Sequence, residues 1–300
     1  MRLLITGSRG FVGASVGIAA ADAGHEVLGV DLSAQPVDGW QGAYQQADVA
    51  HADLAHLIDE FRPDTVIHAA GSASVGGSYD DPVGDLRAAA LTFANALDGV
   101  RRARRRPLVI FPSSAAVYGN PAHLPVAEDA PVSPISPYGF HKAVCELLAR
   151  EYATCFQLDV VVARLFSVYG PRQRRLLLWE LYDQAAGGSA DVVLQGTGGE
   201  TRDYLHVDDV ARIFLAFAAR RPVGLTLANV ASGHEVSTLE LARAVVAAVG
   251  ADKPVRTLGQ VRQGDPLNWR ADVKQTAGLG VVPRELLDGV RECVAAWRNA

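Results

Sequence analysis

A tyrosine and a lysine stand four residues apart in the segment Tyr138-Gly139-Phe140-His141-Lys142. On a helix this spacing places both side chains on one face. A free tyrosine titrates at about 10 and is a poor base at neutral pH. A neighbouring ammonium favours the phenolate, so the pair can move a proton to or from a bound molecule. Ser114 stands where an upstream strand should end, and its hydroxyl can hydrogen-bond the same oxygen.

A second chemical feature is the run of glycines in Thr6-Gly7-Ser8-Arg9-Gly10-Phe11-Val12-Gly13. Gly7 and Gly10 let a backbone turn sharply and approach a pyrophosphate, and Gly13 lets the next helix pack close to the sheet. The N-terminus of that helix offers free N–H groups and partial positive charge to phosphates. The spacing predicts dinucleotide binding, although three glycines alone are a weak signal.

Asp31 ends the apolar run that follows this turn. A carboxylate at that position can bind both hydroxyls of an adenosine ribose, and it repels a 2′-phosphate. We therefore predict NAD as the cofactor, and not NADP. The alternative is a plain strand-turn-helix with an exposed aspartate.

The elements that must position these residues alternate between short β-branched runs and longer amphipathic stretches. Such alternation predicts an α/β fold with a doubly wound parallel sheet, covered on both faces and joined by right-handed crossovers. The expected strands cover residues 2–6, 26–31, 44–48, 65–69, 108–113 and 160–165, and the expected helices 12–23, 53–61, 85–102 and 138–156.

The rhythm of the sequence changes after about residue 170. Helical patterns at 174–186, 208–220, 238–249 and 283–297 alternate with short strands and glycine-rich turns. We expect residues 1–170 to form the NAD-binding domain. Residues 171–300 should form mainly a smaller C-terminal α/β lobe for substrate, intertwined with the first domain and without a clean linker.

Composition sets the broad class of the protein. Of its 300 residues, 49% are hydrophobic and 20% charged, and the net charge of −5 argues against nucleic acid as a partner. No apolar stretch reaches the ~18 residues of a membrane helix. The chain opens directly on a strand, which leaves no room for a signal peptide. Three cysteines without CxxC spacing fit a reduced cytoplasm, so we expect a cytoplasmic enzyme.

Two further patterns predict no chemistry. The eight histidines show no HExxH motif, so we expect no metal site. The arginine-rich run at 101–106 could mark a nucleic-acid patch. It falls at the expected C-terminal end of a helix, where cations complement the helix dipole, and we interpret it as a solvated helix end.

The ordered motifs together resemble the extended short-chain dehydrogenase/reductase family, in its NAD-dependent nucleotide-sugar epimerase/dehydratase branch. The resemblance spans nearly the whole chain. It rests on the glycine turn, Asp31, Asp48-Val49, His68-Ala69-Ala70-Gly71, residues 113–119, 137–142, 164–171 and 202–210, and Arg262-Gln263-Gly264-Asp265. The resemblance implies a Rossmann-type fold, NAD as cofactor and a nucleotide sugar, such as a UDP-sugar, as substrate.

The resemblance also implies a role for each matching residue. Tyr138 would be the catalytic acid/base, Lys142 the modulator of its ionisation, and Ser114 the catalytic Ser/Thr. The implied cofactor contacts are Gly7, Gly10, Phe11, Val12, Gly13, Asp31, Asp48, Val49, Ala69, Ala70, Gly71, Tyr138 and Lys142, with Asp48 and Val49 near the adenine. The implied substrate contacts are Ser114, Ser167, Arg174, Arg202 and Arg262, of which Arg202 and Arg262 match arginines that hold the diphosphate.

Two alanines favour one reaction of the branch. Its 4,6-dehydratases and decarboxylases carry Glu, often Asp-Glu, just after the catalytic Ser/Thr, whereas this chain has Ala115 and Ala116. We therefore expect 4-epimerisation through a transient 4-keto sugar, with hydride passing to NAD and returning to the other face. The alternatives are a nucleotide-4-keto-sugar reductase of the same fold and a non-catalytic NAD-sensing or RNA-associated protein.

Three residues depart from the usual pattern of the branch. Ser167 and Ala88 stand where many members have Asn, and His141 stands where Ser is usual. Ser at position 167 together with Arg174 resembles the uronic-acid 4-epimerases, in which the arginine pairs with the sugar carboxylate. Arg175 and a leucine run follow Arg174, which is not the usual continuation in those epimerases. A structural or diphosphate-facing role for Arg174 is therefore at least as well supported as binding of a sugar carboxylate.

The resemblance also bears on assembly. The family commonly dimerises through the helix after the third crossover and the Tyr-Lys helix. The apolar faces of residues 86–100 and 144–156 can form a four-helix bundle, so we expect a homodimer. Alternatively, the same faces cover the sheet.

Overall fold

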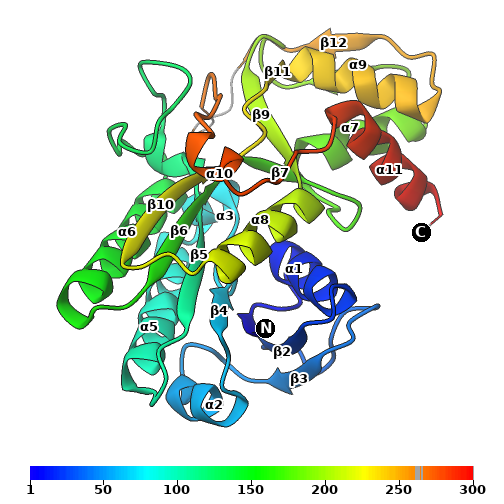
Figure 1. Cartoon of the computed structure of the whole chain (residues 1–300). Coiled ribbons are helices and arrows are strands. Elements are labelled where there is room, and N and C mark those ends of the chain that lie inside the picture. Colours follow the sequence, from blue (N-terminus) through cyan, green and yellow to red (C-terminus); the bar gives the residue numbers. More distant parts are fainter. Residues whose placement is uncertain (261–263, 265, 300) are drawn as a thin grey trace.

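The computed structural model describes residues 1–260, 264 and 266–299. Seven strands form one parallel sheet in the order β10-β6-β5-β4-β1-β2-β3 (Figure 1). The strands are β1 (Arg2–Thr6), β2 (Glu26–Asp31), β3 (Ala43–Gln46), β4 (Thr65–His68), β5 (Leu108–Ser114), β6 (Val160–Leu165) and β10 (Leu225–Val230). The chain winds outward from β1 in both directions, which is the doubly wound Rossmann-type fold. The predicted fold class is confirmed.

Helices cover both faces of this sheet. On one face lie α1 (Phe11–Asp22) and α8 (Val207–Arg220), and on the other α2 (Leu54–Phe61), α5 (Thr92–Arg102) and α6 (Pro137–Phe156). Successive residues of a strand point to opposite faces. Leu3 and Ile5 therefore join the core under α1 and α8, whereas Leu4 joins the other core. Double coverage is why the central strands β1 and β6 are mostly apolar and buried.

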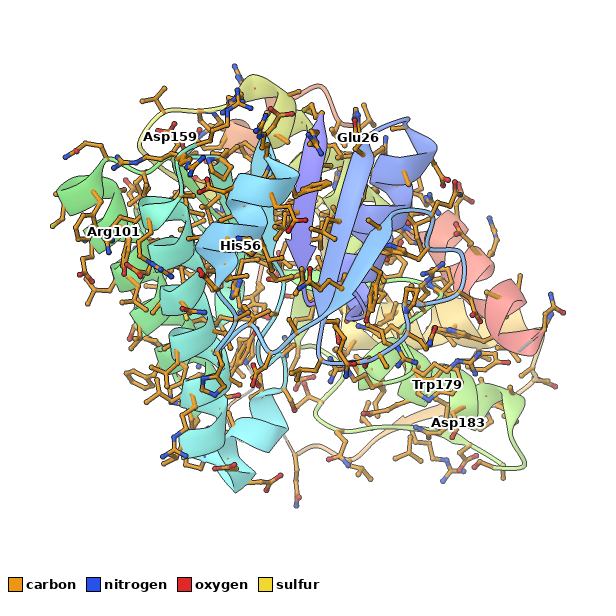
Figure 2. All side chains as sticks on the ribbon, turned by 90° about the horizontal axis from the view of Figure 1, so that it is seen from below. Glu26, His56, Arg101, Asp159, Trp179 and Asp183 are labelled. Atoms are coloured by element: carbon orange, nitrogen blue, oxygen red, sulfur yellow. The ribbon has the colours of Figure 1, made fainter. Side chains whose placement is uncertain are left out.

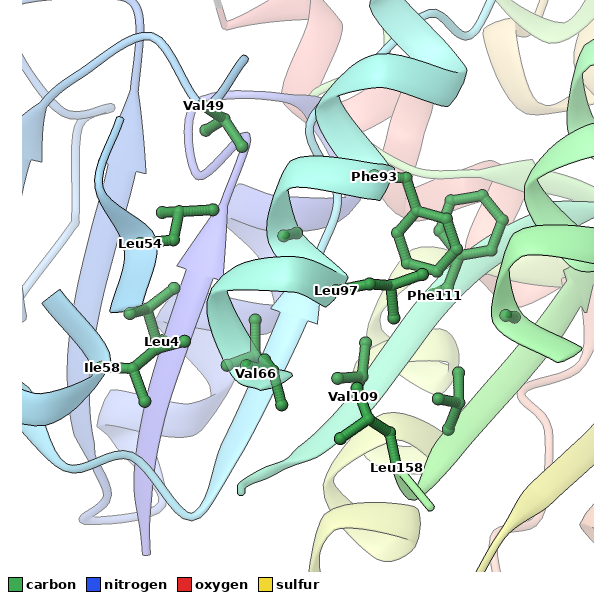
Figure 3. Packing of buried hydrophobic residues seen from close by; sticks show 14 of the residues in the cluster. Leu4, Val49, Leu54, Ile58, Val66, Phe93, Leu97, Val109, Phe111 and Leu158 are labelled. Atoms are coloured by element: carbon green, nitrogen blue, oxygen red, sulfur yellow. The ribbon is translucent and has the colours of Figure 1, made fainter. Parts of the chain in front are cut away.

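The core beneath α2 and α5 anchors the strand that leads to Ser114. Figure 3 shows Leu4, Val66 and Val109 of neighbouring strands packed beneath apolar side chains of α2 and α5. In the same cluster the rings of Phe93 and Phe111 stack with their centroids 4.0 Å apart. Phe111 lies three residues before Ser114 on β5, so this packing holds the strand end in place.

The helix expected over 85–102 is not uniform. It consists of α4 (Pro82–Leu86), a π-helical turn (Arg87–Leu91) and α5. The Thr92 hydroxyl donates to the carbonyl oxygens of Ala88, at 2.5 Å, and Ala89, at 3.2 Å. π turns are frequent at functional sites, and here Ala88 and Thr92 line a cavity. Periodicity could not reveal this turn, because the flanking residues keep a helical pattern.

A smaller part of the molecule has its own core and two small sheets. One joins β11 (Glu235–Ser237), β9 (Thr201–His206) and β7 (Ser167–Tyr169); the other joins β12 (Val255–Thr257) and β8 (Val192–Leu194). Helices α7 (Leu176–Ala186), α9 (Thr238–Val249) and α11 (Leu286–Arg298) surround this core. The short elements are α3 (Val75–Asp80), a 3-10 turn (Ala115–Tyr118) and α10 (Lys274–Ala277).

The chain crosses between the two parts repeatedly. It first leaves the large sheet after β6 to form β7. After β9 it returns to the large sheet, where α8 packs against α1 and β10 pairs with β6, and then it leaves again for β11. Residues 207–230 therefore belong to the large sheet, although they follow residue 170.

Three arginines of the arginine-rich run at the end of α5 pair with acids. Figure 2 places Arg101 at the periphery of the molecule. Arg101 and Arg102 pair with Asp98, at 2.8 and 2.9 Å. Arg104 pairs with Asp59 at 3.8 Å.

Within the described part of the chain, no helix combines the length and the apolar character that crossing a membrane requires.

Candidate active site

The turn between β1 and α1 is so close that two of its glycines have no room for a side chain. Gly7 has a φ of +67°, and a Cβ on it would lie 2.4 Å from the backbone nitrogen of Ala70. A Cβ on Gly13 would lie 2.2 Å from the carbonyl oxygen of Gly7. The chain therefore needs glycine at both positions, and bare backbone is left facing the edge of the sheet.

A cavity of about 520 Å³ opens over this turn at the carboxyl ends of β1, β2, β3 and β4. Eight of the predicted cofactor residues line it: Gly7, Gly10, Asp31, Asp48, Val49, Ala69, Ala70 and Gly71. Five lining residues were not predicted as cofactor contacts: Arg9, Leu32, Ser33, Ala88 and Thr92. Arg9, Leu32 and Ser33 adjoin predicted residues in the sequence, and Ala88 had been noted only as a departure from the usual pattern of the family.

The acidic rim of the cavity is held by backbone N–H groups. The Asp31 carboxylate accepts from the nitrogens of Arg9, at 2.9 Å, and Ser33, at 3.2 Å. The loop that carries Asp48 and Val49 is tied down by Asn95, whose amide donates to the Val49 carbonyl at 2.7 Å. A glycine backbone at a helix N-terminus, with a fixed carboxylate across the cavity, fits a dinucleotide whose ribose lacks a 2′-phosphate.

The predicted tyrosine and lysine lie at the start of α6. Ser136 caps this helix by accepting from the Gly139 nitrogen at 3.2 Å. The Lys142 ammonium is nearly buried, lies 5.7 Å from the centre of the Tyr138 ring, and donates to the Pro112 carbonyl at 3.1 Å. The expected pairing of the two side chains on one face is present.

Ser114 and α6 meet through the 3-10 turn that follows β5. The Ser114 hydroxyl accepts from the Ala116 nitrogen at 3.1 Å, and Tyr138 packs against the apolar cluster that contains Ala115 and Ala116. A Cβ on Gly139 would lie 2.6 Å from the Ala116 carbonyl oxygen, so glycine lets the helix approach. The serine, the tyrosine and the lysine therefore converge at one edge of the sheet, with apolar residues where an acid would serve dehydration.

The predicted substrate residues lie in separate places. Ser167 begins β7 opposite Tyr204 of β9. On β9, Arg202 donates to the carbonyls of Thr201 and Leu267, at 2.8 and 3.3 Å, and its guanidinium lies 5.7 Å from the centre of the Trp269 ring. Arg262 lies outside the described residues.

Arg174 lies on a second cavity, of about 920 Å³, that adjoins the first at Arg9 and Gly10. Its guanidinium is 5.0 Å from the centre of the Trp179 ring. Three more arginines, Arg9, Arg172 and Arg175, line the same cavity, as does Phe11. Arg202 is not among the residues lining it, so the two arginines do not share a described cavity. Four of the predicted cofactor residues line neither cavity: Val12, Gly13, Tyr138 and Lys142.

His68 is a buried neighbour of this site that sequence reasoning treated only as part of a motif. Its Nδ1 lies 2.9 Å from the Thr6 hydroxyl, and its ring packs against Phe93. Burial, and then the nearby Lys142 cation, lower the pKa of His68 from 6.5 to about 3. The folded protein therefore holds this histidine neutral.

This burial predicts a pH-dependent stability. The pKa of His68 is 6.5 in the unfolded chain and about 3 in the native state. Below pH 6.5 the unfolded chain therefore binds a proton that the native state does not, and the free energy of unfolding falls as the pH drops from 6.5 toward 3. We expect a loss of about 1.4 kcal/mol per pH unit. The free energy of unfolding, measured with urea at pH values between 7 and 5, should fall less steeply with decreasing pH for His68→Gln than for the wild type. Part of this pH dependence should remain, because burial also lowers the pKa of His206. An equal pH dependence in the variant and the wild type would contradict the role given to His68.

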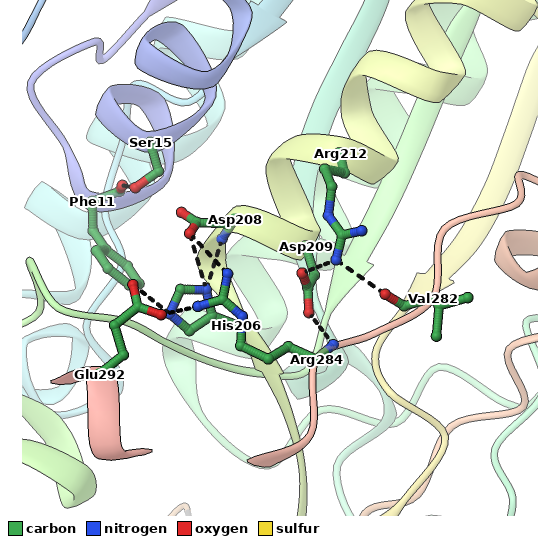
Figure 4. Close-up of polar contacts among 9 residues, drawn as sticks. All are labelled: Phe11, Ser15, His206, Asp208, Asp209, Arg212, Val282, Arg284 and Glu292. Atoms are coloured by element: carbon green, nitrogen blue, oxygen red, sulfur yellow. Dashed lines mark hydrogen bonds and ion pairs between the residues drawn. The ribbon is translucent and has the colours of Figure 1, made fainter. Parts of the chain in front are cut away.

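A polar cluster lies where β9 runs into α8 (Figure 4). Among the described residues, His206, Asp208 and Glu292 have ligand atoms close enough for a metal ion. The Arg284 guanidinium already pairs with both acids, at 3.3 Å from Asp208. We interpret the cluster as a polar joint between α8 and α11, in which one arginine pairs with an acid of each helix. Sequence spacing had given no signal for it.

Comparisons with known proteins bear on this arrangement. A model described as the NAD dependent epimerase/dehydratase family matches residues 3–230. The chain is 33% identical over 315 residues to a UDP-glucose 4-epimerase of Mycolicibacterium smegmatis, covering 100% of this chain and 99% of the relative. It is 30% identical over 321 residues to a dTDP-glucose 4,6-dehydratase of an Actinoplanes species, covering 99% and 98%. The solved structure of MoeE5 in complex with UDP-glucose and NAD is 28% identical, with a TM-score of 0.90 and coverage of 100% and 99%. The chain belongs to the NAD-dependent epimerase/dehydratase family.

Proposed function

We propose that this protein is an NAD-dependent UDP-sugar 4-epimerase. The observation that carries the proposal is the arrangement of Tyr138 and Lys142 on α6 against the carboxyl end of β5, which carries Ser114 and neighbours β4. Buried Ala115 and Ala116 follow the serine. A relative named as a dehydratase is 30% identical over 321 residues, so the family alone does not decide the reaction. Dehydration needs an acid or base that neither alanine can supply.

The residues of the dinucleotide cavity would hold NAD, which accepts a hydride when bound and can return it. Tyr138 would take the proton of the C4 hydroxyl, and Ser114 would hydrogen-bond the same oxygen. The Lys142 ammonium, 5.7 Å from the centre of the Tyr138 ring, would bind the ribose. Arg202 and Arg262 would hold the diphosphate, and Ser167 would contact the sugar. Arg174 would bind either a sugar carboxylate or the diphosphate.

We also propose the division of labour between the two parts of the chain. Residues 1–170 would supply the NAD site, and residues 171–300 would supply mainly the substrate lobe. Arg202 lies on β9 of the three-stranded sheet of β11, β9 and β7, outside the large parallel sheet, which supports this division.

The direct test is proton NMR of the purified protein with no added cofactor. UDP-glucose, UDP-N-acetylglucosamine and UDP-glucuronate are each incubated with it. We expect new anomeric signals from the 4-epimer of at least one of them, which would also show that NAD stays bound. A 4-keto-6-deoxy product would indicate dehydration instead, and no change with any sugar would count against the proposal.

The Asp31 carboxylate predicts a strong preference for NAD. Nucleotide released on denaturing the purified protein should be NAD, with little NADP. Removing this acceptor of ribose hydroxyls by Asp31→Ala costs about 1.5–3 kcal/mol, so we expect NAD affinity to fall at least tenfold. Asp252→Ala is the charge-matched control in an exposed loop. More NADP than NAD in the wild-type extract would refute the assignment.

We further propose a cytoplasmic homodimer. Several apolar side chains are exposed along the expected interface: Leu86, Leu91, Val144 and Leu147. Covering such a face removes apolar surface from water. The free state of all three cysteines fits a reducing compartment. Light scattering should give twice the chain mass of 31.8 kDa, and Leu147→Asp should reduce it to the monomer.

A further inference from the structure

The inner face of α6 carries a third polar residue beyond the partly buried Tyr138 and the buried Lys142. Glu146 follows Lys142 at the same four-residue spacing, so the three side chains form one row along the helix. Glu146 is only 8% exposed, and the mechanism above does not use it. A buried carboxylate needs partners, because an unpaired charge is costly away from water.

Glu146 has those partners on two different strands. Its Oε1 accepts from the Ser113 hydroxyl of β5, at 2.6 Å, and from the Arg164 Nε of β6, at 3.0 Å. Its Oε2 accepts from the Arg164 Nη2 at 2.7 Å. The same guanidinium donates to the Tyr118 hydroxyl, at 2.7 Å, which in turn donates to the Asn229 side chain. The carboxylate therefore joins α6 to both strands in a connected network.

The position of Ser113 gives this network its consequence. Three successive residues of β5 face the row on α6 or the candidate site: the Pro112 carbonyl accepts from Lys142, Ser113 donates to Glu146, and Ser114 follows. Glu146 thereby fixes the position of the end of β5 along the axis of α6. This position decides whether Ser114 and Tyr138 can reach the same substrate oxygen. A shift of about 1 Å in such a position can cost two orders of magnitude in rate.

We propose that Glu146, held by Arg164, is a positioning residue that fixes Ser114 relative to Tyr138 and Lys142. The proposal rests on the function proposed above. A buried ion pair is not required for stability as such, because well-packed apolar residues often replace one without loss. The effect of the Glu146–Arg164 ion pair on rate can therefore be separated from its effect on folding.

The first test is Ser113→Ala, which removes one bond to Glu146 and leaves the Arg164 pair intact. We expect kcat to fall about tenfold, with KM, bound NAD and the urea midpoint nearly unchanged. Ser113→Thr restores the hydroxyl and should recover most of the rate. Thr238→Val is the matched control, since it removes a buried hydroxyl that donates to the carboxylate of Glu200, away from the site. A wild-type kcat for Ser113→Ala would overturn the proposal.

The second test is the pair Glu146→Leu with Arg164→Met, which leaves no unpaired buried charge. We expect a folded, NAD-bound protein with a kcat reduced more than in Ser113→Ala. Its crystal structure gives a readout independent of turnover: the distance from Ser114 Oγ to Tyr138 Oη should differ from that in the wild type. An unchanged distance would overturn the positioning role even if the wild type catalyses another reaction. A wild type without epimerase activity would instead refute only the proposed function.

Discussion

Replacing Tyr138 with phenylalanine is expected to abolish turnover and to leave NAD bound. The phenyl ring keeps the packing against the Ala115 and Ala116 cluster, so the start of α6 should stay in place. What is lost is the hydroxyl that exchanges a proton with the C4 oxygen. General acid–base catalysis contributes about 10²–10⁴-fold, and we expect kcat to fall within that range. The measurement combines the NMR assay with quantification of the nucleotide released on denaturation.

Tyr152→Phe is the matched control for this variant. It removes a tyrosine hydroxyl from the other end of the same helix, where the ring contacts Phe156 at a centroid distance of 5.0 Å. Its kcat should equal that of the wild type. If Tyr138→Phe kept wild-type turnover, the tyrosine would not be the acid/base. If it lost both turnover and NAD, the effect would lie in the fold of the site and not in proton transfer.

Gly7→Ala is expected to have the largest effect on stability and cofactor content. The added Cβ would meet the backbone of Ala69 and Ala70 at 2.4–2.5 Å, and backbone atoms cannot rotate away as a side chain can. The positive φ adds strain of about 1–2 kcal/mol, and overpacking typically adds about 1–3 kcal/mol. We therefore expect unfolding to become easier by about 3 kcal/mol, with loss of bound NAD. Urea unfolding and nucleotide extraction measure the two effects.

Gly24→Ala separates the collision from the strain. Gly24 has a comparable φ of +77°, and a Cβ on it would meet nothing within 4 Å. This variant should therefore show only the conformational cost of about 1–2 kcal/mol and keep its NAD. Equal effects of the two substitutions would show that the close approach of Gly7 to the end of β4 does not matter.

The sequence by itself determined the features that depend on neighbouring residues. The apolar runs of β1, β4 and β5 indicated buried parallel strands, because a strand covered on both faces has no polar side to show. The glycine spacing indicated the turn at Gly7 and Gly13, because only glycine has room there. Helical periodicity placed Tyr138 and Lys142 on one face. Each of these inferences needs only a short stretch of chain.

Only the tertiary structure decided which distant segments meet. The Glu146 carboxylate is held by Ser113, 33 residues before it, and by Arg164, 18 residues after it. The partners of Arg174 and Arg202 are tryptophans that no motif connects to them. Such contacts depend on how helices pack against the strands of the sheet. The local conformational preferences of the chain do not determine that packing. The packing of α6 against β5 and β6 therefore determines the geometry of the candidate site, whereas the sequence motifs identify its members.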